Sequence, residues 1–175
     1  MEKIAMKDLL SVIRDEFGKF ILEVREEDLP TVIIKRDGFL EFIDFLRKEG
    51  FNHLLDLCAV DYLNYKPEKK IERFEVVYHL YSIPKRELLR VKVPIAESDC
   101  WQYSLTSFWK AANWFERECF DMFGIRFKGH PDLRRLLMPE DWEGHPLRKD
   151  YPVELPEEKE WKAYRKFKTK AKGAQ

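Results

Sequence analysis

Residues 73–95 read RFEVVYHLYSIPKRELLRVKVPI and contain two runs in which every second side chain is apolar. In the first run the apolar positions go from Phe74 to Leu80, and in the second they go from Leu89 to Ile95. Because successive side chains of a β-strand point to opposite faces, this alternation predicts two strands with one buried face and one wet face. The link between them is short enough for a hairpin. Such a pair is typical of an antiparallel sheet that packs against helices.

The segments before the hairpin supply further elements of an α+β fold. Short β-branched runs predict strands over residues 20–24 and 31–35, and the apolar run at 53–61 predicts a buried strand. Apolar side chains at helical spacing predict one helix over residues 4–17 and a second that follows Asp37, which can cap it, and ends at Gly50. We therefore expect a mixed or antiparallel sheet packed with helices.

A third helix is predicted from about Thr106 to Phe123. Its apolar side chains recur at spacings of four and three residues, which forms a continuous stripe along one face: Phe108, Ala112, Phe115, Cys119 and Met122. Gly124 follows and can take the left-handed conformation that ends a helix. We expect this helix to complete a compact domain that comprises residues 1–124.

Residues 125–175 have a different character and are predicted to form an extended C-terminal arm. Five prolines interrupt any helix or central strand there, namely Pro131, Pro139, Pro146, Pro152 and Pro156. The segment nevertheless keeps apolar side chains that a flexible linker would lack: Phe127, Leu133, Leu136, Leu137, Met138, Trp142, Leu147 and Tyr151. A long irregular segment of this kind cannot bury its own apolar side chains well, so we expect it to wrap over a partner protein.

The charge balance narrows the classes of function. Lys and Arg number 32 and Asp and Glu number 32, so no general attraction to nucleic acid or to an anionic membrane is implied. The basic, aromatic tail at residues 161–175 is short, and a solvated tail explains it better than a nucleic-acid contact. Charged residues make up 37% of the chain, against about 25% in typical domains, which favours a thermophilic source.

The cysteines and the N-terminus indicate a soluble protein in a reducing compartment. Cys58, Cys100 and Cys119 are odd in number and form no C-x-x-C pair, which argues against a disulfide framework and against a cysteine-based metal centre. The first residues lack the apolar core of a signal peptide. No run approaches the roughly 18 apolar residues that a membrane span needs.

Four charged residues crowd the end of the third predicted helix: Glu116, Arg117, Glu118 and Asp121. Arg117 and Asp121 are four residues apart and can pair on one face. The cluster suits either a recognition surface or a solvated helix face with an internal ion pair. A catalytic or metal role together with His130 or His145 is the weaker interpretation, because the sequence shows no pocket and no ligand spacing. Glycine-rich phosphate loops are also absent from the sequence.

A longer pattern includes this cluster, and it resembles the motif of one subunit of respiratory complex I, the NADH–quinone oxidoreductase. That subunit is the C subunit of the bacterial enzyme, also called the thirty-kilodalton subunit. The matching positions in the stretch ERECFDMFGIRFKGHPDLRRLL are Glu116, Arg117, Glu118, Asp121, Met122, Phe123, His130, Arg134, Leu136 and Leu137. The stretch GHPLRKDYP, residues 144–152, is also similar to the family and contributes His145, Arg148, Asp150 and Tyr151. The family includes related subunits of energy-converting membrane-bound [NiFe] hydrogenases.

The resemblance implies a non-catalytic scaffold in the cytoplasmic peripheral arm of a membrane-bound oxidoreductase. It implies a large partner of the forty-nine-kilodalton or [NiFe]-hydrogenase-like type, a small iron–sulfur partner, and only indirect contact with membrane subunits. It also implies that this chain holds no cofactor or metal, and that iron–sulfur clusters and NiFe or flavin belong to partner chains. On this hypothesis Arg117 and Asp121 fix the helix end, and Glu116, Glu118, His130 and Arg134 organise the turn before the arm. The expected apolar anchors are Leu136, Leu137, Trp142 and Tyr151.

Several functions remain as alternatives. The short chain and its dense charge favour a thermophilic membrane-bound hydrogenase or a ferredoxin-linked relative as the parent complex. The C subunit of an NADH–quinone oxidoreductase is the alternative. A stand-alone enzyme that uses the carboxylates of Glu116, Glu118 and Asp121, and a nucleic-acid-binding module that uses residues 162–175, explain less, because neither accounts for the arm and the long motif together.

Overall fold

The computed structural model describes residues 6–65 and 72–153. The first half of the chain contains two α-helices, three strands and a short 3-10 helix, in the order α1 (Met6–Phe17), β1 (Ile21–Arg25), β2 (Thr31–Ile34), η1 (Arg36–Gly38), α2 (Phe39–Lys48) and β3 (His53–Asp61). The second half continues with β4 (Phe74–Ser82), β5 (Glu87–Ile95), η2 (Glu97–Asp99), β6 (Trp101–Tyr103), α3 (Ala112–Phe123) and β7 (Arg126–Lys128).

The predicted hairpin lies inside a five-stranded sheet. Strands β4 and β5 pair antiparallel from Phe74 opposite Ile95 to Ser82 opposite Glu87, which confirms the predicted hairpin. The predicted wet face is wrong for the first half of β4, because Glu75 and Val77 are buried as well. The strand order is β1-β2-β5-β4-β3, and β2 runs parallel to β5 while the other pairs are antiparallel. The sheet is therefore mixed and packs with helices, as the α+β prediction required.

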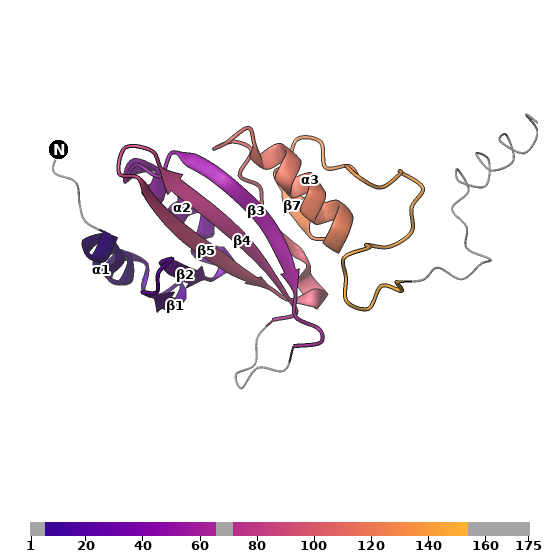
Figure 1. Ribbon diagram of the computed structural model, residues 1–175, viewed down its shortest axis with the longest axis horizontal. Coiled ribbons are helices and arrows are strands. Elements are labelled where there is room, and N and C mark those ends of the chain that lie inside the picture. Colours follow the sequence, from indigo (N-terminus) through magenta and orange to yellow (C-terminus); the bar gives the residue numbers. More distant parts are fainter. Residues whose placement is uncertain (1–5, 66–71, 154–175) are drawn as a thin grey trace, which may run out of the picture.

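The core lies between the sheet and the helices. Figure 1 shows α2 behind the broad face of β3, β4 and β5, with α3 alongside β3. The Phe39 ring of α2 packs on the Tyr78 ring of β4 at 4.8 Å between centroids, and both side chains are fully buried. None of the helices within residues 6–65 and 72–153 has the length and apolar character needed to cross a membrane.

Two predicted helix starts are wrong. Asp37 does not cap α2, because it lies within the 3-10 turn of residues 36–38 and α2 begins at Phe39 without a side-chain cap. The helix α3 begins at Ala112 and not near Thr106. The chain before it forms tight turns, in which the backbone N–H groups of Phe108 and Trp109 both donate to the Leu105 carbonyl at 2.9 Å.

The chain after Gly124 first joins the compact part of the molecule. Strand β7 pairs in parallel with β6, and Ile125 and Phe127 are buried. The irregular segment therefore starts at residue 129, and not at residue 125 where the sequence placed it. Strands of three residues are too short to show alternation, which is why neither β6 nor β7 was predicted.

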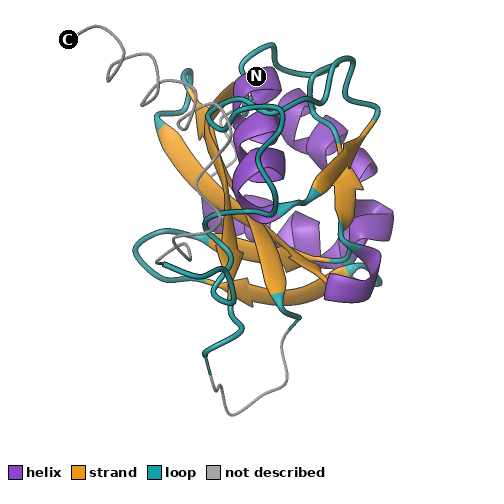
Figure 2. Ribbon diagram, turned by 90° about the vertical axis from the view of Figure 1, so that its right-hand side faces the viewer, coloured by secondary structure: helices purple, strands orange, loops and turns teal. Residues whose placement is uncertain are grey.

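Residues 129–153 form turns and bends without a regular element. In Figure 1 this segment leaves β7 and returns alongside α3, and in Figure 2, seen from the side of the arm, its loops cross in front of the helices and strands. We call residues 129–153 the arm below. The predicted basic tail, residues 161–175, lies outside the described residues, as do residues 1–5.

Candidate functional site

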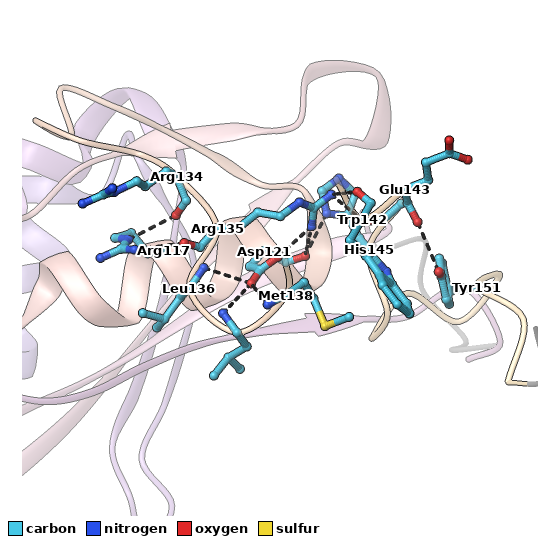
Figure 3. Close-up of polar contacts among 12 residues, drawn as sticks. Arg117, Asp121, Arg134, Arg135, Leu136, Met138, Trp142, Glu143, His145 and Tyr151 are labelled. Atoms are coloured by element: carbon cyan, nitrogen blue, oxygen red, sulfur yellow. Dashed lines mark hydrogen bonds and ion pairs between the residues drawn. The ribbon is translucent and has the colours of Figure 1, made fainter. Parts of the chain in front are cut away.

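The carboxylate of Asp121 is the centre of the contact between α3 and the arm. Asp121 is fully buried, and its Oδ2 accepts hydrogen bonds from the backbone N–H groups of Leu136, Leu137 and Met138 at 3.0, 2.7 and 2.8 Å (Figure 3). Its Oδ1 accepts from Arg135 at 2.7 Å. Burial acts to raise the pKa of this carboxyl, but the amides and the guanidinium outweigh burial and leave the pKa below its ordinary value. Asp121 is therefore an ionised anchor for the arm.

Arg135 extends this anchor to a second part of the arm. Its Nη2 donates to the carbonyl oxygens of Trp142 at 2.8 Å and Gly144 at 3.0 Å (Figure 3). One guanidinium thus ties α3 to two turns of the arm. The sequence prediction named the neighbouring Arg134 instead, whose side chain is exposed and pairs with Asp132 at 3.0 Å. Adjacent arginines look alike in a sequence, so only the backbone geometry shows which one turns inward.

The last carbonyls of α3 also bind the arm. A helix end leaves its final carbonyl groups without partners in the helix. Residues 145–148 supply three donors: His145 Nδ1 to the Asp121 oxygen at 2.9 Å, the Leu147 backbone N–H to the Met122 oxygen at 3.1 Å, and Arg148 Nε to the Phe123 oxygen at 2.6 Å. Because a carbonyl can only accept, the His145 proton resides on Nδ1. The stretch GHPLRKDYP therefore acts as a C-terminal cap for α3.

Two glycines permit close packing, one where the arm meets the end of α3 and one within the arm. Gly124 has a φ of +76°, and a Cβ there would lie 2.5 Å from His145 Nε2 and 2.7 Å from Arg148 Nη2. Gly144 has a φ of +84°, and a Cβ there would lie 2.6 Å from the Tyr151 ring. The Tyr151 hydroxyl donates to the Glu143 carbonyl at 3.1 Å. Tyr151 therefore braces a turn within the arm itself.

A second anchor holds the end of the arm to the main sheet. Asp61, at the end of β3, accepts from Arg73 at 3.0 Å and from the Lys149 backbone N–H at 2.9 Å. Arg73 also pairs with Asp150 of the arm at 2.7 Å and with Glu97. Burial acts to raise the pKa of Asp61, but the bonds to Arg73 and to the backbone hold it below its ordinary value. No local pattern in the sequence could have indicated this contact.

We expect Asp61→Asn to weaken this anchor far more than Asp150→Asn does. The Asp61 side chain is fully buried, and losing its charge leaves the mostly buried Arg73 without its inner partner, at a cost of about 3 kcal/mol in unfolding free energy. The Asp150 side chain is 50% exposed, so its loss should cost less than about 1 kcal/mol. Urea unfolding of both variants measures the difference, and equal costs would contradict the anchor.

Arg117 shapes the turn that leads into the arm. Its Nε donates to the Arg134 carbonyl at 3.1 Å and its Nη2 to the Arg135 carbonyl at 2.9 Å. The predicted ion pair between Arg117 and Asp121 is wrong, because Asp121 turns to Arg135 and the arm amides. The Arg117 guanidinium also lies over the exposed Trp114 ring, 5.3 Å from its centroid.

His130 stabilises the same turn. Its Nδ1 accepts from the Asp132 backbone N–H at 3.0 Å, so the proton resides on Nε2, which donates to the Asn113 carbonyl at 3.3 Å. Burial lowers the pKa of both His130 and His145, which keeps them neutral at pH 7. The neutral state agrees with the single-proton tautomers that their contacts require.

The predicted carboxylate cluster does not form one site. Glu116 is fully buried and accepts from the Leu105 backbone N–H at 2.6 Å, so it holds the loop before α3 and does not organise the turn before the arm. Glu118 is exposed and makes no hydrogen bond or salt bridge with any described residue. Together with Asp121, these carboxyls have three separate surroundings. Among residues 6–65 and 72–153, no three His, Cys, Asp or Glu side chains gather in a way that could hold a metal ion.

The expected apolar anchors divide into two groups. Leu136, Trp142 and Tyr151 are half-buried, whereas Leu137 is 63% exposed. Leu147 and Val153 are also exposed, as is Trp114 on α3. Polar groups thus hold the arm on α3, while several large apolar side chains face outward.

This chain is similar to known proteins of one family. The family model described as respiratory-chain NADH dehydrogenase, 30 Kd subunit, matches residues 32–157. A protein of Geotalea uraniireducens (strain Rf4), named as the C subunit of an NADH-quinone oxidoreductase, is 45% identical over 152 residues, which cover 86% of this chain and 90% of that protein.

Two solved structures resemble this chain. One is described as Nqo5 of the trypsin-resistant fragment (1-134) and is 35% identical, with a TM-score of 0.65 over 73% of this chain and 98% of the other. The second is the membrane-bound sulfane sulfur reductase, described as an archaeal respiratory membrane complex. It is 23% identical, with a TM-score of 0.69 over 94% of this chain and 91% of the other, and it supports the fold alone.

Proposed function

Since the chain belongs to the thirty-kilodalton subunit family of the respiratory-chain NADH dehydrogenase, we propose that it is the C subunit of an NADH–quinone oxidoreductase. In this role it is a scaffold of the peripheral arm and carries out no chemistry itself. The flavin and the iron–sulfur clusters belong to partner chains, and the protein sits on the cytoplasmic side, bound to the membrane only through its partners.

The similarity of the relatives supports the NADH–quinone oxidoreductase more than the hydrogenase-type complex. The sequence alone favoured a thermophilic membrane-bound hydrogenase, whose large subunit would carry NiFe. The relative with 45% identity over most of both chains has the NADH–quinone name instead, and the sulfane sulfur reductase complex shares only the fold. The hydrogenase-type complex therefore becomes the second candidate, and the thermophilic source stays a prediction from charge density.

The observation that carries the proposal is the way the arm is held. Asp121, Arg135 and the α3 carbonyls hold the arm through polar contacts. The large apolar side chains Leu137, Leu147 and Val153 of the arm are left exposed. Large apolar side chains held in a fixed geometry suit a protein interface, because little conformational entropy is lost on binding. We assign these side chains to the large partner of the forty-nine-kilodalton type, next to the small iron–sulfur partner.

The family-motif residues then have structural roles on this chain. Asp121, His145 and Arg148 hold the arm on α3, and Arg117 and His130 shape its first turns. Met122 and Phe123 contribute their carbonyls, and Leu136 and Leu137 their amides. These residues position the partner-binding surface and assist assembly.

A pull-down of the tagged chain from its own membranes in mild detergent tests the proposed function. We expect the large and small partners to co-purify, with flavin, iron and NADH oxidation in the eluate. Nickel and iron without flavin would place the chain in a hydrogenase-type complex. Recovery of the chain alone would overturn the scaffold role.

Leu137→Glu is expected to reduce recovery of the large partner at least tenfold, since a charge would enter an apolar interface; this is about 1.4 kcal/mol or more of binding free energy. The melting temperature of the isolated chain should not change, because this side chain is 63% exposed. Leu22→Glu on β1 is the matched control, at 52% exposure and away from the arm (Figure 1). Equal recovery of the partner with both variants would remove Leu137 from the interface.

A further inference from the structure

A buried polar group of α3 contacts the loop before the helix and not the arm. Glu116 has no exposed surface, and its Oε1 accepts from the Leu105 backbone N–H at 2.6 Å. Its Oε2 has no hydrogen-bond partner among the described residues, and the same holds for the Tyr78 hydroxyl of β4 and for Nε2 of Gln102 in β6. Tyr78, Gln102 and Glu116 are all fully buried, and the charge of Glu116 acts to raise the pKa of the Tyr78 phenol.

The surroundings of Glu116 contain no compensating cation. No salt bridge in the described part of the chain includes it, whereas the buried Asp121 and Asp61 each pair with an arginine. A buried carboxylate without a cation is unstable relative to the neutral acid. Burial accordingly raises the pKa of Glu116 from 4.5 to about 7, although the Leu105 amide and the Ser104 side chain oppose the rise.

The titratable groups coupled to Glu116 supply no positive charge. Burial, followed by the charge of Glu116, raises the pKa of the Tyr78 phenol of β4. Burial also raises the pKa of the Cys119 thiol on α3, with smaller contributions from Cys58 and Asp56 of β3 and from Glu118 and Glu116 of α3. Both Tyr78 and Cys119 are therefore held in their neutral forms.

We propose that Glu116 is a buried proton-binding site that locks the loop before α3 while its carboxyl group is neutral. The neutral acid can accept from the Leu105 amide with one oxygen and keep its proton on the other, which no described group hydrogen-bonds. Loss of the proton leaves a buried charge, which is relieved when the loop at residues 104–106 separates from α3 and admits water. The arm is bound to the same helix, from Asn113 to its last carbonyls, so proton uptake stabilises the platform that carries it. This inference does not depend on the identity of the parent complex.

Infrared titration of the whole chain tests the proposal, with Glu116→Gln and the exposed Glu118→Gln as a matched pair. We expect a carboxylic acid C=O band at pH 6 that fades with a midpoint near 7, is absent in Glu116→Gln, and persists in Glu118→Gln. Protection of the Leu105 amide from hydrogen exchange, corrected for the intrinsic pH effect, should fall over the same range only where Glu116 is present.

Stability gives a second readout. Between about pH 4.5 and 7 the unfolded chain releases this proton while the folded chain keeps it, so the folded state binds more protons and becomes less stable as pH rises. The folding equilibrium constant of the native chain should therefore fall by about two powers of ten relative to Glu116→Gln across this range. If Glu116→Gln does not fold, the native chain alone still tests the proposal. The absence of a carboxylic acid C=O band at pH 6 would show that Glu116 is ionised and would overturn the proposal. A stability ratio independent of pH overturns it as well.

Discussion

Asp121→Ala is expected to release the arm from α3 and to lower the free energy of unfolding by about 3–5 kcal/mol. The substitution removes one fully buried carboxylate that serves three consecutive backbone N–H groups and the Arg135 guanidinium. All four donors then lack the carboxylate, and the half-buried arginine keeps only the backbone carbonyls of residues 121, 142 and 144.

Urea unfolding and hydrogen exchange measure this effect directly. The amides of Leu136, Leu137 and Met138 should lose protection in Asp121→Ala, whereas Glu118→Ala, on the same helix but exposed, should leave both protection and stability within about 0.5 kcal/mol of the parent chain. Acid should have the same effect as the substitution. The folded-state pKa of Asp121 lies below its unfolded value, so its contribution is present at neutral pH and is lost as pH falls through the folded-state pKa. Unchanged protection in Asp121→Ala would show that other contacts hold the arm.

Gly124→Ala is expected to cause the second-largest loss of stability. Comparison with Gly129→Ala separates backbone strain from the collision with the arm. Both glycines have positive φ, +76° and +90°, so alanine at either position costs about 1–2 kcal/mol in backbone strain. A Cβ at Gly129 meets nothing within 4 Å, whereas one at Gly124 falls within 2.7 Å of both His145 and Arg148. The difference between the two variants therefore isolates the collision between α3 and the arm.

We expect Gly124→Ala to melt several degrees below Gly129→Ala and to be cleaved faster by trypsin after Arg148 and Lys149, because the displaced arm exposes these bonds. Gly129→Ala should show the strain alone, with the trypsin pattern of the parent chain. Identical melting and cleavage in both variants would mean that the arm can move away from Gly124 without loss.

The elements with strong periodicity were predicted closely. Strand β3 has the predicted bounds of residues 53–61, and the hairpin of β4 and β5 has the expected pairing. The start of α3 was placed six residues too early, because apolar residues at the same spacing continue into turns closed on the Leu105 carbonyl. Periodicity reports which face of a segment is buried, and it cannot distinguish a helix from a series of turns that bury the same face.

The contacts at the end of α3 were not predictable from the motif. The motif includes the end of α3 and the stretch at residues 144–152, and the structure brings these two segments into contact. The motif did not show that Asp121 binds Arg135 in preference to Arg117, since spacing along a helix allows the closer pair. It also placed Glu116 with the arm, although this side chain faces Leu105.

The sequence by itself determined the hairpin, the α+β class, the irregular character of the arm and the resemblance to the thirty-kilodalton subunit family. These features depend on alternation, helical spacing, prolines and a long motif, which are local along the chain. Only the tertiary structure decided which groups bind each other. Asp121 meets Arg135 across 14 positions, and Asp61 meets the Lys149 amide across 88. The physical reason is that a buried charge takes whichever donors the folded backbone brings within about 3 Å, and distance along the chain does not predict that proximity.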